Sequence, residues 1–112
     1  MEARDLRDLV RFDEDGPHHE DLFESDHLWS EVVCLDRNQS LGTIRDADSD
    51  ALLLIVTGRV VVQVNRARKR LEQWGTTFVP AGSELSLTNA GEDPSVVLLV
   101  AAPPPVRRAV TE

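Results

Sequence analysis

The amino-acid sequence predicts an all-β domain, a closed barrel or a sandwich of short strands, with a short helix at its N-terminus. Three observations support this prediction. Short aliphatic and β-branched runs recur along the chain, and turn residues separate them roughly every eight residues. The length of 112 residues suffices for one hydrophobic core but not for two. We therefore expect a single β-domain.

The predicted elements follow in chain order. Residues 5–12 place Leu6, Leu9 and Val10 on one face of a short helix capped by Asp5, and DEDGP then ends it. DRNQSLG at 36–42 is expected to be a loop, and turns are expected at 57–58 and 65–67. Strands are expected within 28–35, 51–71, 76–82, 84–89 and 95–103. The chain divides into an acidic segment with the helix (1–27), the β-barrel (28–105) and a flexible tail (106–112).

The net charge of −8 lies in the first part of the chain. Residues 1–31 contain 11 acidic and 3 basic side chains, whereas residues 32–112 contain 9 of each. Acidic surfaces repel nucleic acid and anionic membranes, and few aromatic residues are present to stack on bases. We therefore expect neither nucleic acid nor a membrane among the partners.

The chain is expected to have no signal peptide and no membrane span. MEARDLRDLVRFDED contains no apolar run, and ALLLIV and VVLLVAA are too short to cross a bilayer. The single cysteine, Cys34, lies in the strand-like run EVVCL, where we expect a small buried hydrophobic residue. A chain that cannot form an internal disulfide suits the reducing cytoplasm, which is the expected localisation.

The segment WGTTFVPAGSELSLTN, residues 74–89, matches most of a motif that consists of Gly, five residues, Pro-x-Gly, two residues, His, three residues and Asn. Pro80, Gly82 and Asn89 stand in its frame, whereas Trp74 replaces the first glycine and Leu85 the histidine. With the flanks LFESDHLWSEVVCLDRNQS and LLVAAPPP, the chain resembles the cupins over residues 22–105. The resemblance implies a cupin-type jelly-roll β-barrel.

The resemblance also implies where the metal ligands of the family would lie. The first cupin motif ends at Gly58, so its glutamate falls on Ala51 and its His-x-His pair on Ile44 and Asp46. Three imidazoles and a carboxylate can hold a first-row metal, but isoleucine, alanine and leucine have no lone pair to donate. One carboxylate is not a site. We therefore expect no metal and no cofactor.

Side chains at the former ligand positions are expected to point into the barrel, and strand alternation adds further residues to the same face. The expected ligand pocket consists of Ile44, Asp46, Ala51, Leu53, Leu85, Leu87 and Asn89. Only Asp46 and Asn89 are polar, and the small Ala51 should leave room beside Leu53 and Leu85. This lining either packs as a solid core or encloses a dry cavity for an apolar ligand.

Three functions remain open. The favoured prediction is a metal-independent barrel that binds a small, largely apolar molecule in its interior without redox chemistry. A metal-independent cyclase or isomerase of a biosynthetic intermediate would instead use Asp46 or Glu84 as acid or base. A structural or partner-binding barrel would need no pocket at all. The residue pattern does not decide whether the chain is an enzyme.

Two charged clusters lie outside the motifs. Solvation is favoured over weak metal binding for His18, His19 and His27. Protection of an edge strand is favoured over an anion or phosphate site for Arg66, Arg68, Lys69 and Arg70. This basic hairpin could also contact the acidic N-terminal segment, within one chain or across a dimer.

A homodimer is expected because a barrel of this size has exposed sheet edges. A monomer should also cover the apolar residues of the N-terminal region incompletely. These residues are Leu22, Phe23, Leu28 and Trp29.

Overall fold

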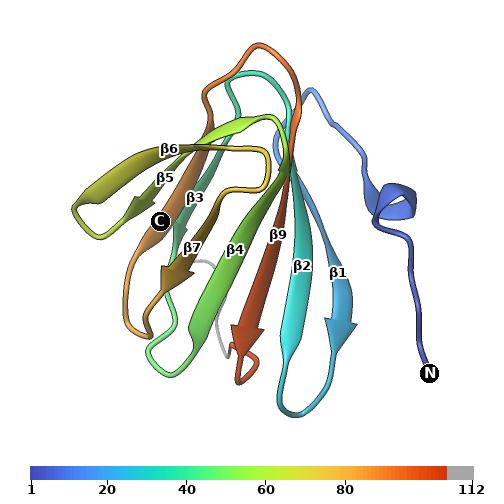
Figure 1. The fold of residues 1–112 in the computed structure, drawn as a ribbon, viewed down its shortest axis with the longest axis vertical. Helices are drawn as coiled ribbons and strands as arrows, with labels where there is room; N and C mark the ends of the chain where they lie inside the picture. The colour runs from blue at the N-terminus through green and yellow to red at the C-terminus, as the bar shows by residue number, and fades with distance from the viewer. Residues whose placement is uncertain (106–112) are drawn as a thin grey trace.

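The computed structural model describes residues 1–105, which form two antiparallel sheets packed face to face (Figure 1). A five-stranded sheet has the order β1-β2-β9-β4-β7, and a four-stranded sheet has the order β3-β8-β5-β6. The strands are β1 (His18–Glu24), β2 (Trp29–Leu35), β3 (Ser40–Ile44), β4 (Asp50–Thr57), β5 (Arg59–Val64), β6 (Ala67–Glu72), β7 (Thr76–Val79), β8 (Leu85–Asn89) and β9 (Ser95–Ala102). The predicted all-β class is confirmed. The tail predicted at 106–112 lies outside the described residues.

Two of the predicted turns connect strands as expected. Gly58 joins β4 to β5 with a φ of 90°, a conformation that side-chain-bearing residues rarely adopt. A Cβ atom at Gly58 would also lie 2.8 Å from the backbone Cα of Ser95, too close to be accommodated without movement. Asn65 begins the β5–β6 turn with a φ of 55°, which asparagine tolerates better than most residues. Both turns therefore require a residue that tolerates a positive φ, and not merely a polar one.

The main core fills the space between the sheets, where alternate residues of each strand face inward. Leu53, Ile55, Val60, Leu87 and Val97 are fully buried there. The sequence pattern had indicated the same alternation. This packed interior determines how much room is left for a ligand.

A second, smaller core lies on the outer face of the five-stranded sheet, under the N-terminal segment. The 3-10 turn η1 (Leu6–Leu9) places Leu9 against Val32, Cys34 and Val96. Cys34 is fully buried, as predicted, and burial raises the pKa of its thiol. Asp5 caps η1 by accepting the Arg7 backbone N–H at 2.9 Å. The N-terminal segment thus packs its apolar residues onto the outer face of the sheet, which its acidic composition did not predict.

Three details differ from the sequence prediction. The helix expected over 5–12 is a single 3-10 turn of 4 residues. β1 falls inside the segment expected to precede the barrel, and it pairs antiparallel with β2, so His18 and His19 lie in the sheet rather than before it. β3 extends through the end of the loop expected at 36–42 and pairs with β8. Within residues 1–105, no helix is long and apolar enough to cross a membrane.

Candidate functional site at the barrel mouth

The structure brings four of the predicted pocket residues to one cavity at an end of the barrel. Ile44 at the end of β3, Ala51 on β4 and Leu85 at the start of β8 form its walls, and Asp46 lies at its rim. The cavity measures about 40 Å³. Its other lining residues are Trp29, Arg45, Ser49, Val79, Pro80, Ser83, Leu99, Ala101 and Pro105. The lining is therefore mostly apolar and includes the polar residues Arg45, Asp46, Ser49 and Ser83.

Hydrogen bonds hold the two loops that border this cavity. The backbone carbonyl of Asp46 accepts the Gly82 N–H at 2.8 Å, and the carboxylate of Asp50 accepts the Ala81 N–H at 2.9 Å. Ser49 donates its hydroxyl to the Pro103 carbonyl at 2.6 Å, which ties the first loop to the end of β9. Loops connected in this way form a defined opening.

The Asp46 carboxylate takes part in the structure of its own loop. Its Oδ1 accepts the Asp48 backbone N–H at 2.8 Å, in a turn that Asp commonly forms. The side chain is half-buried at the cavity rim. Asp46 is thus both a loop-forming residue and the carboxylate nearest to the apolar walls.

The other predicted pocket residues do not reach this cavity. Leu53 and Leu87 are fully buried in the main core and do not line this cavity. Asn89 is also buried, but its side chain donates to the carbonyls of Leu35 at 3.0 Å and Asp93 at 2.9 Å. The Asn89 amide therefore holds the connection after β8 rather than facing a ligand.

The weak catalytic candidate Glu84 also lies outside the cavity. Its side chain is exposed, and its backbone N–H donates to the Asn65 side-chain oxygen at 3.0 Å. Asn65 and Glu84 link the β5–β6 turn to the start of β8. The structure therefore does not bring Glu84 and Asp46 together as an acid/base pair in this cavity.

Sequence reasoning missed Trp29 as a cavity residue and assigned it to an uncovered surface. Its exposure is only 4%, and its indole Nε1 donates to the Asp21 carboxylate at 3.2 Å. Two residues further along β2, Glu31 is buried and lies 2.9 Å from His19 Nδ1. Polar residues of β1 thus cover this side of the barrel. The alternation of β2 was a usable signal, because it puts Trp29 on the same face as Val33 and Leu35.

Comparison with solved structures defines the fold. No family model and no curated protein matches the sequence. The crystal structure of TT1209 from Thermus thermophilus is 28% identical, with a TM-score of 0.88, over 94% of this chain and 100% of that one. A protein from Klebsiella pneumoniae described as having a double-stranded beta-helix domain is 15% identical, with a TM-score of 0.90, over 100% and 98%. A cupin superfamily protein from Desulfitobacterium hafniense is 20% identical, with a TM-score of 0.75, over 87% and 86%.

The chain has the cupin fold. Trp74 is one position at which the residue differs from the cupin motif but the spacing of the motif is retained. It stands at the first glycine position of the second motif, and its φ is 74°. The backbone there keeps the conformation that favours glycine, although a tryptophan that is 70% exposed occupies it. The motif frame has been retained at the level of the backbone.

The metal of the cupin motif requires donors that this cavity does not supply. Ile44, Ala51 and Leu85 present hydrocarbon, and Leu85 is 3% exposed in the packed core. Within residues 1–105, no group of three or more His, Cys, Asp or Glu side chains is arranged to hold a metal ion. The residues that the motif comparison places at the ligand positions therefore do not form a donor set for such a metal.

Proposed function

We propose that this cupin barrel is a small-molecule-binding module without a catalytic metal, and that its ligand inserts a small apolar group into the barrel mouth. One observation supports the proposal: Ile44, Ala51 and Leu85, which the motif comparison places at the metal-ligand positions, line one cavity together with the polar residues Asp46, Ser49 and Ser83. Such an arrangement suits a ligand with an apolar end and a polar end. The single cysteine that the sequence analysis associated with the cytoplasm is compatible with this role.

The size of the cavity narrows the class of ligand. A volume of about 40 Å³ is far below the roughly 300–1,000 Å³ of pockets that enclose drug-sized ligands. Leu53 and Leu87, expected to line a larger interior pocket, are instead fully buried members of the main core cluster. A short alkyl group suits this volume, and Asp46, which also lines the cavity and is half-buried, would contact the polar part of the ligand. The proposal therefore moves the ligand from the interior to the mouth.

The alternative of a metal-independent cyclase or isomerase receives less support. Acid/base catalysis of such reactions uses a proton donor and acceptor within hydrogen-bond reach of the substrate. Asp46 is the one carboxylate in the lining of the mouth cavity, as far as residues 1–105 define it. Glu84 lies elsewhere. Binding alone requires no second group and is the simpler function for this geometry.

Methyl NMR tests the proposal directly. Isobutanol and cyclopentanol are titrated into protein labelled at Ile, Leu and Ala methyl groups. We expect saturable shifts at Ile44, Ala51 and Leu85 and none at Leu53 or Leu87. The variant Ala51→Val, which occupies the cavity, should remove the shifts. Shifts that are absent, or that persist in Ala51→Val, would contradict binding at the mouth.

The structural or partner-binding function is a second candidate, favoured by a different observation. Leu52 and Phe78 are 49% and 58% exposed on the outer face of the five-stranded sheet. Exposed apolar patches commonly mark protein interfaces. We propose that this face pairs two copies of the chain. Leu28 is also exposed, but Trp29 is in the core and is not available for pairing.

A further inference from the structure

A groove runs between the edges of the two sheets, separate from the barrel mouth. β6 ends the four-stranded sheet and β7 ends the five-stranded sheet, and no ladder joins these two strands. The groove has a volume of about 620 Å³, within the range of small-molecule sites. Its lining residues are Val62, Val64, Asn65, Ala67, Arg68, Lys69, Leu71, Thr76, Thr77, Phe78, Pro80 and Ser83. It is thus far larger than the mouth cavity.

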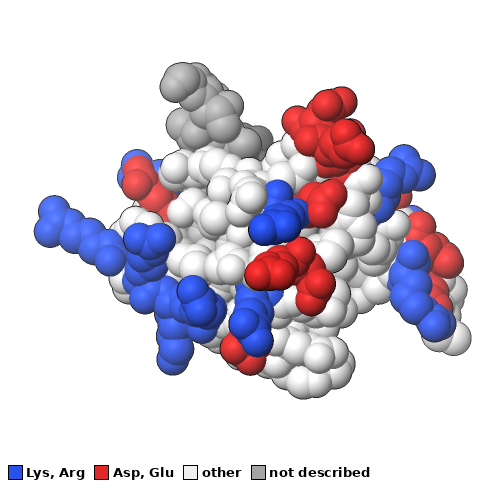
Figure 2. Space-filling view, turned by 90° about the horizontal axis from the view of Figure 1, so that it is seen from above, with Lys and Arg blue, Asp and Glu red and all other residues white. Residues whose placement is uncertain are grey.

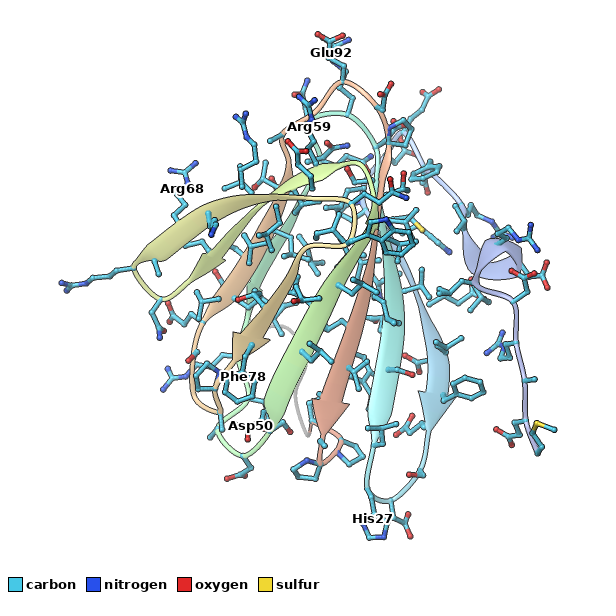
Figure 3. The ribbon with its side chains drawn as sticks, viewed as in Figure 1. His27, Asp50, Arg59, Arg68, Phe78 and Glu92 are labelled. Atoms are coloured by element: carbon cyan, nitrogen blue, oxygen red, sulfur yellow. The ribbon has the colours of Figure 1, made fainter. Side chains whose placement is uncertain are left out.

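The floor of the groove is apolar because it is the uncovered edge of the core. Val62 is 4% exposed, and Val64 and Leu71 pack against the same core cluster. Phe78, near the end of β7 (Figure 3), also lines the groove. Thr76 and Thr77 add hydroxyl groups along the β7 side. An apolar body would find a complementary surface here.

Lys69 belongs to the inner side of β6, toward the groove. It lies directly opposite Val62 in the β5–β6 ladder, and directly opposite residues project from the same face of a sheet. The flanking inward positions of β6 are Ala67, opposite Val64, and Leu71, opposite Val60. The Lys69 ammonium is therefore carried on the side of the strand that faces the apolar floor.

The rim of the groove is positively charged. Figure 2 shows Lys and Arg side chains gathered on the side of the molecule that the β5–β6 hairpin occupies. Within residues 1–105, none of Arg66, Arg68, Lys69 and Arg70 forms an ion pair. The acidic N-terminal segment lies beyond β1, on the opposite side (Figure 1), so the contact considered within one chain is not made. Lys69 and Arg68 line the groove, whereas Arg66 and Arg70 do not.

We infer that this groove binds an amphipathic organic anion, with its apolar body on Val62, Val64 and Leu71 and its anionic group on Lys69. The occupant is a small carboxylate or sulfonate with an alkyl or aryl body, because the floor is hydrocarbon and the Lys69 ammonium stands on one wall. A phosphate without an apolar body would leave the floor uncovered. This site is independent of the proposed site at the barrel mouth.

Anilinonaphthalene sulfonate is a suitable probe because its fluorescence rises on apolar surfaces and it carries one anionic group. We expect saturable binding that octanoate displaces and octanol does not. Lys69→Gln should weaken the affinity about tenfold, the usual loss for one charge-assisted hydrogen bond. Arg70→Gln is the matched control, because it removes the same charge one residue away outside the groove. Its affinity should stay within about twofold of the wild type.

A second variant tests the apolar part of the site. Ala67→Phe places an aromatic ring in the groove at an exposed strand position that tolerates large side chains. Probe binding should be lost while the thermal melt stays unchanged. Equal losses in Lys69→Gln and Arg70→Gln would overturn the inference in favour of general charge attraction. Unchanged probe affinity in Lys69→Gln, together with self-association on gel filtration, would show that Lys69 only guards the sheet edge.

Discussion

Phe78 on β7 lies directly opposite Leu52 on β4, and both side chains face away from the core. Leu52 in turn lies opposite Val100 on β9, so the apolar row crosses three strands. The N-terminal segment packs against Val32, Cys34, Val56 and Val96 on the same face but does not extend over this row. The row carries no charge, and a second copy would present the same surface to it in an isologous pair.

The first prediction is that Phe78→Lys converts a homodimer into a monomer. A buried lysine without a partner would make the paired state unfavourable, because its charge must leave water. Light scattering coupled to gel filtration measures the mass at tens of micromolar protein. Gln63→Lys adds the same charge on the opposite sheet, at an exposed position, and should leave the dimer intact. A monomer mass for the wild-type protein would rule out pairing through this face.

The second prediction compares two substitutions at Ala51. Ala51→Val adds a volume that the cavity of about 40 Å³ accommodates, so the melting temperature should stay the same or rise slightly. Ala51→Phe exceeds this volume, and overpacking costs about 1–3 kcal/mol. At about 4–8 °C per kcal/mol for a domain of this size, the loss is several degrees. Calorimetry measures both melting temperatures. Equal values would mean that the mouth cavity can expand to accept a phenylalanine ring.

The third prediction concerns the backbone at Trp74. Trp74→Gly should raise stability by roughly 1 kcal/mol, since a φ of 74° strains any residue that has a Cβ. The side chain is 70% exposed, so its removal forfeits little packing. Trp74→Ala is the control, because it removes the indole but keeps the strain. If alanine stabilises as much as glycine in urea denaturation, the exposed ring and not the backbone is responsible.

The fourth prediction is that protein purified without an affinity tag carries much less than one equivalent of iron, manganese, nickel or zinc. The ligand positions provide Ile44, Asp46, Ala51 and Leu85, which do not form a donor set. Elemental analysis measures the content. Added zinc should also leave the melting temperature unchanged, because a metal held by the folded state alone would raise it. One equivalent bound with a raised melting temperature would refute metal independence.

Alternation and turn residues were sufficient to predict the fold class and the central strands from the sequence. β1 was missed because its sequence, HHEDLFE, does not alternate between apolar and polar residues. Its polar side chains form hydrogen bonds with β2 instead: Asp21 accepts from the Trp29 indole, and His19 pairs with the Glu31 carboxylate. Such a strand can be recognised only after its partner is known. β3 was missed because it is short and its pairing shifts register between Leu41 and Ile44.

The candidate site was predicted in part. The motif frame grouped Ile44, Asp46, Ala51 and Leu85, and all four line the mouth cavity. It could not give the volume, which depends on how Trp29, Leu99 and other distant residues pack around them. Alternation put Asn89 on the correct face but could not show that its amide is used by Leu35 and Asp93. The groove between β6 and β7 was not predicted because it is created by the separation of two sheet edges.

Cys34 is buried beneath η1, so the rate at which its thiol reacts reports how often the N-terminal segment detaches from the sheet. An alkylating reagent cannot reach the sulfur until Leu9 and its neighbours move away from β2. The rate of alkylation therefore measures how frequently this local opening occurs. Because the chain has no other cysteine, no second reaction obscures the signal. Alkylation of the wild-type protein can thus measure the free energy of opening of the N-terminal segment, without any engineered label.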